Sequence, residues 1–136
     1  MKISAKAEYA CLAILALAQS KPGDPPVRIR DIAGSHGIPE RYLVQILLQL
    51  KGAGLVHSTR GASGGYRLAR PSAQISLGEV LGAIDGPGEP PRESTKPAAQ
   101  VLAAVWENIR AAEKAVLDRT SIAELCERTT PHEWFI

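Results

Sequence analysis

Residues 57–70 hold the side chains with the clearest chemistry in this chain. The segment reads His-Ser-Thr-Arg-Gly-Ala-Ser-Gly-Gly-Tyr-Arg-Leu-Ala-Arg, so arginines flank a glycine-rich stretch. An arginine beside a slim turn, such as Arg60, can enter the minor groove of DNA, whose narrow stretches concentrate negative potential. The residues that would keep this turn slim are Gly61, Ala62, Ser63 and Gly64. We therefore predict a DNA contact here, against the alternative of a free surface arginine.

A glycine-rich segment can instead cradle the phosphates of a nucleotide. That use requires a Gly-Lys-Ser/Thr ending between a strand and a helix, and residues 57–70 have neither feature. Residues 55–59 and 65–69 have the composition of two short strands, with glycines in the turn that connects them. We expect a β-hairpin, with Arg67 and Arg70 behind its tip as further candidate phosphate contacts.

Helical apolar spacing covers residues 28–53 and is interrupted once, at Gly37-Ile38-Pro39. Gly37 can adopt the positive φ that ends a helix, and Pro39 presets the φ of the next helix's first turn. Two helices joined by so tight a turn form a helix-turn-helix. In the second helix, the apolar residues of the inner stripe are Leu43, Ile46, Leu47 and Leu50.

The second of these helices carries polar side chains that could recognise DNA bases. Arg41 can reach guanine and Gln45 can pair with adenine in the major groove, with Tyr42 beside them. On an isolated helix such side chains are usually only solvated. Next to the predicted hairpin we expect them to contact DNA, with Lys6 and Arg28 as candidate phosphate contacts.

The remaining elements complete a domain over residues 1–86. A helix is expected over residues 4–19 with Ser4 as its N-cap, and a proline-rich loop follows it. Ser76 and Glu79 have the spacing of a capping box, which predicts a further short helix. The fold class is therefore mainly α: a winged helix-turn-helix domain whose wing is the small β-hairpin.

A long helix is expected after a linker rich in proline and glycine at residues 87–97. Residues 98–136 form the last unit, in which residues 98–117 resume a strong helical period. A shorter last helix follows, capped by Thr120 or Ser121, and Trp134-Phe135 is expected to pack back. One wide apolar face of the long helix needs a partner surface, in its own domain or in a second subunit. We predict a homodimer contact through Leu102, Val105, Trp106, Ile109 and Val116.

Composition limits the possible classes of protein. The chain has 136 residues, 45% of them hydrophobic, which suits a compact domain with an appended arm and excludes a multidomain enzyme. Residues 1–86 carry ten Lys/Arg against six Asp/Glu, a net charge of +4, whereas residues 87–136 have a net charge of −2. We expect only the first part to face a polyanion. The N-terminal segment has no signal-peptide or membrane-spanning pattern, so we expect a cytoplasmic protein.

Cysteine and histidine are too sparse for a metal or disulfide framework. Cys11 and Cys126 are the two cysteines, and none of the three histidines has metal-ligand spacing to either. Both cysteines are expected to pack as small hydrophobic residues in helices. A thiol sensor at Cys11 is the weaker alternative, because no basic neighbour is evident that would lower its pKa. We predict no catalytic and no metal site.

Several segments together resemble the Rrf-two (BadM-type) transcription regulators of bacteria. They are the opening Met-Lys-Ile-Ser-Ala-Lys-Ala-Glu-Tyr-Ala, Tyr42-Leu43, Gly52-Ala-Gly-Leu-Val56, Arg60-Gly-Ala-Ser-Gly-Gly-Tyr-Arg-Leu-Ala-Arg-Pro71 and Ile75-Ser-Leu-Gly-Glu-Val80. The resemblance covers most of the chain, and its wing sequence is the most specific part. It implies homodimers in which each wing and recognition helix meets DNA, with the long helices crossed between subunits.

The chain departs from this family in two places. Sensing members carry three cysteines between the fourth helix and the dimerisation helix, where residues 86–100 contain none, so the resemblance implies a member without an iron-sulfur cluster. An acidic residue of the first helix helps hold the metal in some members. Glu8 could take that place, but without thiolates we expect a solvated or ion-paired carboxylate. Val44 stands where the family often has glutamate, so cytosine readout by that carboxylate is lost.

We expect a DNA-binding regulator, not an enzyme. It would bind a palindromic operator as a homodimer and repress by occupying a promoter. The competing hypothesis is a winged-helix module that binds proteins and has lost DNA binding, because a fold does not fix a function. A steep fall of DNA affinity with salt would separate the two hypotheses. The sequence identifies no small-molecule effector.

Overall fold

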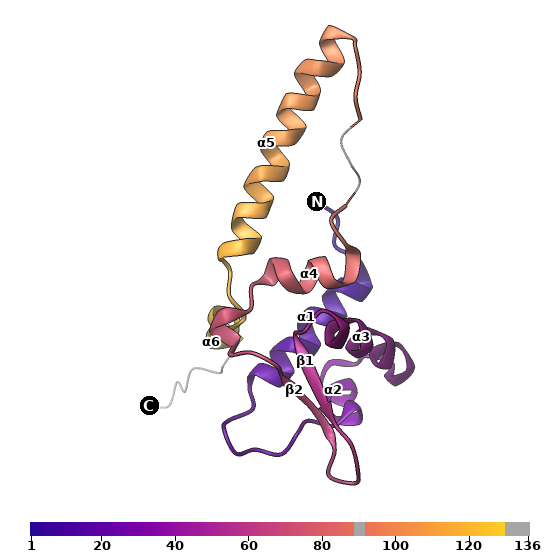
Figure 1. The fold of residues 1–136 in the computed structure, drawn as a ribbon, viewed down its shortest axis with the longest axis vertical. Helices are drawn as coiled ribbons and strands as arrows, with labels where there is room; N and C mark the ends of the chain where they lie inside the picture. Colours follow the sequence, from indigo (N-terminus) through magenta and orange to yellow (C-terminus); the bar gives the residue numbers. More distant parts are fainter. Residues whose placement is uncertain (89–91, 130–136) are drawn as a thin grey trace.

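The computed structural model describes residues 1–88 and 92–129 (Figure 1). The predicted linker at 87–97 and the predicted segment 98–136 are therefore described only in part, and Trp134-Phe135 lies outside the described residues. The elements in chain order are α1 (Ala5–Ala18), α2 (Ile29–His36), α3 (Glu40–Gly52), β1 (Val56–Thr59), β2 (Gly65–Leu68), the 3-10 helix η1 (Ser72–Gln74), α4 (Leu77–Asp85), α5 (Pro97–Arg119) and α6 (Ile122–Thr129). The prediction of a mainly α-helical winged helix-turn-helix is confirmed.

Helix α1 lies at the centre of the packed domain and contacts α3, α4, α6 and β2. It begins where predicted, because the Ser4 hydroxyl accepts a hydrogen bond of 3.0 Å from the Ala7 amide. Its buried face is rich in alanine, which lets neighbouring helices approach closely. The buried residues of α1 are Ala7, Ala10, Ala13, Ile14 and Leu17.

The helix-turn-helix forms as the turn residues predicted. Gly37 ends α2 in the left-handed conformation, at a φ of 64°, and its amide donates to the Ala33 carbonyl. Pro39 then directly precedes α3. The predicted inner stripe of α3 is fully buried, with Leu43, Ile46, Leu47 and Leu50 all at 0% exposure. Burial of this stripe fixes which residues of α3 face away from the core.

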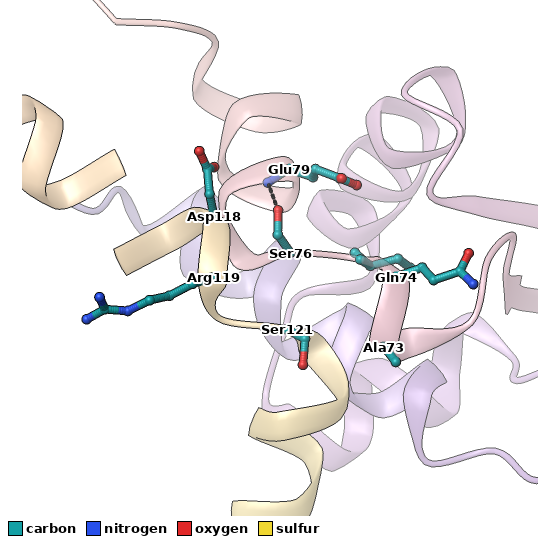
Figure 2. Close-up of a pocket in the computed structure, with 8 residues that line it drawn as sticks. Ala73, Gln74, Ser76, Glu79, Asp118, Arg119 and Ser121 are labelled. Atoms are coloured by element: carbon teal, nitrogen blue, oxygen red, sulfur yellow. Dashed lines mark hydrogen bonds between the residues drawn. The ribbon is translucent and has the colours of Figure 1, made fainter. Parts of the chain in front are cut away.

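The start of α4 is joined to the segment between α5 and α6 (Figure 2). The Leu77 amide donates to the Thr120 carbonyl at 2.8 Å, and the Ile122 amide donates to the Ile75 carbonyl at 2.9 Å. Ile75 and Ile122 are both fully buried. Helix α6, grouped with α5 in the predicted domain division, therefore contributes to the core around α1.

The predicted capping box at Ser76 and Glu79 is only half formed. The Ser76 hydroxyl accepts from the Glu79 amide at 3.1 Å, as an N-cap should. The Glu79 carboxylate, however, forms an ion pair with Arg70. A pocket of about 380 Å³ beside this pair is lined in part by Asp118, which is itself paired with Lys114 at 2.5 Å. Two carboxylates of this pocket thus already have cationic partners.

Helix α5 extends away from the packed domain, at the opposite end of the molecule from the β1–β2 hairpin (Figure 1). None of its residues is buried. We also considered that Trp106 packs in the core of its own chain; it is 50% exposed, so that alternative is wrong. No helix in the described part of the chain is long and apolar enough to cross a membrane.

Candidate nucleic-acid interface

The outward side of α3 carries the side chains predicted to read bases. Arg41 and Gln45 are exposed there, one turn apart. Two apolar residues that the DNA-contact prediction did not include share this side, because Val44 is 36% exposed and Leu48 is 52% exposed. We call the set Arg41, Val44, Gln45 and Leu48 the recognition face. Its spacing of three and four residues could have shown in sequence that all four side chains lie together.

Tyr42 is held in place by a second tyrosine. Its ring meets the ring of Tyr9, from α1, edge to face, with 5.6 Å between centroids and 89° between planes. Tyr42 remains 37% exposed. The contact orders the Tyr42 side chain at the edge of the recognition face, and edge-to-face geometry is favourable for two aromatic rings. Tyr9 was not among the predicted site residues.

The predicted hairpin is confirmed and forms a wing, by which we mean β1, β2 and residues 60–64 between them. The two strands pair antiparallel, from Val56 opposite Leu68 to Thr59 opposite Gly65. Val27, just before α2, adds an antiparallel bridge to Tyr66, with hydrogen bonds of 2.8 and 3.0 Å. The wing is thereby tied to the helix-turn-helix at its base.

Two glycines are required by close packing of backbone in the wing. A Cβ on Gly64 would lie 2.2 Å from the Thr59 carbonyl oxygen, and one on Gly65 would lie 2.5 Å from the Val27 carbonyl oxygen. Gly61 has a φ of 103° and its carbonyl accepts from the Gly64 amide at 2.9 Å. These residues make a tight turn, and the predicted slim tip residues Ala62 and Ser63 are exposed on it.

Two side-chain hydrogen bonds connect the wing to the helices beside it. Arg28 donates from Nη2 to the Ala62 carbonyl at 2.8 Å, reaching from the start of α2 to the wing tip. Lys51 donates from Nζ to the Ser58 hydroxyl at 3.0 Å, linking the end of α3 to β1. Both bonds are exposed. They connect the wing to the start of α2 and the end of α3. Lys51 had no predicted role.

The remaining predicted phosphate contacts are placed differently from one another. Arg60 is exposed beside the wing tip, where it lines a groove together with Arg28. Lys6 is half-buried on α1 and Arg67 is half-buried on β2. Arg70 forms an ion pair with Glu79 and also donates to the Gln74 carbonyl, so its guanidinium is already engaged within the domain.

Cys11 lies near two carboxylates, those of Glu8 on α1 and Asp85 at the end of α4. Burial, then the charges of Glu8 and Asp85, raise the pKa of the half-buried Cys11 thiol to about 11. Asp85 accepts hydrogen bonds from the Ser4 hydroxyl, and Glu8 is exposed. The described residues contain no cluster of three histidine, cysteine or acidic residues able to hold a metal.

Comparison with known families identifies the class of protein. The family profile "Rrf2: Iron-dependent Transcriptional regulator" matches residues 3–128. The chain belongs to the Rrf2 family. This Rrf2-family chain is a DNA-binding transcription regulator and not an enzyme. The predicted function class is therefore confirmed.

Named relatives match this Rrf2-family chain over nearly its whole length. The transcriptional regulator CymR of Bacillus subtilis is 38% identical, over 95% of this chain and 92% of CymR. The regulator IscR of Cereibacter sphaeroides is 33% identical, over 92% of this chain and 86% of IscR. The solved structure of CymR, described as the global cysteine regulator of B. subtilis, has a TM-score of 0.83 at 36% identity and covers 96% of this chain and 99% of that one. The solved structure of T. potens IscR has a TM-score of 0.82 at 32% identity, covering 100% of this chain and 93% of the other.

Proposed function

We propose that this Rrf2-family chain is a homodimeric repressor that binds a palindromic operator. In each protomer α3 enters the major groove and the wing enters the adjacent minor groove with Arg60. The observation that carries this proposal is that the wing is hydrogen-bonded to the helix-turn-helix, through Arg28–Ala62 and Lys51–Ser58. A winged helix that positions an exposed arginine next to a helix carrying Arg41 and Gln45 can contact both grooves at once.

The proposed dimer contact is the apolar face of α5. Its exposed fractions are 66% for Val101, 51% for Leu102, 46% for Val105, 50% for Trp106, 46% for Ile109 and 47% for Val116. A continuous apolar face of this kind marks a protein contact in soluble proteins. A second copy is the occupant we propose, because isologous pairing of identical helices matches the two-fold symmetry of a palindromic site.

We propose that the regulator works without a resident metal, although its family is described as iron-dependent. The donor set is the reason. Residues 86–100 lack cysteine, and the described residues include no cluster of three histidine, cysteine or acidic side chains able to hold a metal. Protein purified without oxygen is expected to be colourless and to contain less than one iron per chain by metal analysis.

Salt titration of DNA binding tests the proposed function directly. An operator selected from random sequence should be bound with an affinity that falls steeply as salt rises, because phosphate contacts release counterions. Arg60→Ala should weaken binding by about 1 to 3 kcal/mol and make the salt slope shallower. Arg128→Ala is the matched control, because Arg128 is an exposed arginine of α6 that forms an ion pair with Glu124.

The control should keep the affinity and salt slope of the unmodified protein. If Arg60→Ala bound the selected operator with unchanged affinity and slope, the wing would not contact DNA. If the unmodified protein selected no DNA sequence at all, the winged-helix protein-binding module would replace the repressor as the better hypothesis.

A further inference from the structure

Two branched apolar side chains, Val44 and Leu48, are partly exposed in the middle of the recognition face. Val44 is 36% exposed and Leu48 is 52% exposed, while the opposite side of α3 is fully buried. Their neighbours on the same face are Arg41 and Gln45, which are polar and exposed. The apolar pair is therefore part of the surface that the proposed function turns toward DNA, and the inference drawn here rests on that function.

Only one group on the base edges of the major groove is apolar. Each thymine presents a 5-methyl group there, whereas adenine, guanine and cytosine present hydrogen-bond donors and acceptors. A valine or leucine that faces cytosine leaves its amino group without an acceptor, and one that faces thymine removes two apolar surfaces from water. Apolar side chains on a recognition helix thus favour thymine over the other bases.

We propose that Val44 and Leu48 contact the 5-methyl groups of thymines, and so determine specificity at two positions of each operator half-site. The residues are four apart on α3, which corresponds to a rise of about 6 Å along the helix axis. Neighbouring base pairs are about 3.4 Å apart. For a helix that lies along the groove, the two thymines are about two base pairs apart in each half-site.

The charge around the pair favours DNA over a protein partner as its occupant. Arg41 lies one turn before Val44 on the same face, and Lys51 lies one turn after Leu48. Arg60 is exposed on the adjoining wing. Cationic side chains at both ends of a short apolar stripe complement phosphates on both sides of a groove. A second copy of the chain would instead bring the same cations against each other.

Replacement of thymine by deoxyuridine is the test, because it removes the methyl group and leaves the hydrogen-bonding edge intact. After selection of an operator, each thymine is replaced singly and the dissociation constant is measured for the unmodified protein, Val44→Ser and Leu48→Ser. Loss of one buried methyl contact should weaken binding by the unmodified protein about three- to fivefold at two positions of each half-site. The deoxyuridine replacement at one of these positions should not change the dissociation constant of Val44→Ser, and the replacement at the other should not change that of Leu48→Ser.

Gln45→Ala is the matched control on the same face. The substitution removes a hydrogen-bonding side chain, so it should weaken operator binding. Binding by this variant should still be weakened further by each of the deoxyuridine replacements. The folding of all three variants is checked by thermal unfolding, and little change is expected since the substituted residues are exposed.

Several outcomes would overturn the inference. One is equal binding of thymine and deoxyuridine operators by the unmodified protein. Another is a methyl effect that persists undiminished in both serine variants. A change in particle mass by light scattering in Val44→Ser or Leu48→Ser would assign the pair to a protein contact instead. Failure of the proposed function itself is distinguishable, because then no operator would be selected and no salt-dependent binding would be measured.

Discussion

Cationic side chains near the candidate interface differ in what they already contact. Arg28 and Lys51 donate hydrogen bonds to the wing, and Arg70 is paired with Glu79. Arg60 and Arg41 are exposed. In sequence these residues are equivalent cations, but a guanidinium bound to a carbonyl has fewer donors left for phosphate. The distinction between residues that would contact DNA and residues that position others therefore comes from the structure.

Arg28 is expected to act on DNA binding mainly through the wing. Arg28→Ala removes the hydrogen bond to the Ala62 carbonyl and should weaken operator binding about 3- to 10-fold, the worth of one such bond. In an Arg60→Ala background the same change should have an effect of less than about twofold, because the wing no longer carries the contact that Arg28 positions. The measurement is a double-mutant cycle of dissociation constants. Additive losses would show instead that Arg28 binds phosphate independently of the wing.

Cys11 is expected to react slowly with alkylating reagents in the folded protein. Burial and nearby carboxylates raise the pKa of its thiol from 9.0 to about 11, so at neutral pH its thiolate fraction is about a hundredfold smaller than that of an ordinary cysteine. The rate of modification at Cys11, followed by mass spectrometry, should rise by about that factor in denaturant.

The same shift predicts a dependence of stability on alkaline pH. Because the folded-state pKa of Cys11 is higher than the unfolded value, its contribution to stability is complete below about pH 9 and is lost as pH rises toward 11. Cys11→Ala should flatten the fall in the free energy of unfolding over this range. Equal pH profiles for the two proteins would contradict the assignment.

The wing depends on close backbone packing at Gly64 and Gly65, which leaves no room for a side chain at either position. Gly65→Ala would place a Cβ 2.5 Å from the Val27 carbonyl oxygen, and backbone on both sides cannot yield. We expect a loss of about 1 to 3 kcal/mol in stability and at least a tenfold loss of operator affinity, because the bridge between Val27 and Tyr66 separates. Thermal unfolding and binding titrations measure the two effects.

Gly82→Ala provides the control for this substitution. Gly82 lies within α4, where a Cβ would meet nothing within 4 Å. Alanine there should raise stability by about 0.5 to 1 kcal/mol through helix propensity and leave DNA binding unchanged. Wild-type operator affinity in Gly65→Ala would show that the wing geometry is not needed for binding.

The elements that could be predicted from sequence are those specified by local patterns. Gly37 and the apolar stripe of α3 specify the helix-turn-helix through chain geometry over a few residues. The glycines between residues 55–59 and 65–69 indicate the hairpin in the same local way. Both elements were correctly predicted. The bonds from Arg28 and Lys51 to the wing, and the Tyr9–Tyr42 contact, join segments that sequence spacing does not relate. Glu79 formed an ion pair outside the predicted capping box for the same reason.

At the scale of the whole molecule, the apolar face of α5 is not covered by the packed domain. The packed domain buries its apolar residues around α1, including Ile122 from α6. Helix α5 buries none, although an aromatic and several branched side chains lie along it. Exposed apolar area of this extent is unfavourable in water. An isologous dimer that covers it would also place two wings and two recognition faces on one DNA molecule.

Charged substitutions on α5 should therefore dissociate the protein. Val105→Glu and Ile109→Glu each place a carboxylate in the proposed contact, and together they should give monomers or aggregates by light scattering at micromolar concentration. Ala111→Glu is the control, since Ala111 is exposed on the opposite side of α5 and should leave the dimer intact. The double variant should also bind the operator at least a hundredfold more weakly, because each half-site then has to be occupied independently. A monomer mass for the unmodified protein at the same concentration would instead show that α5 does not form the dimer, and a palindromic operator would lose its structural basis.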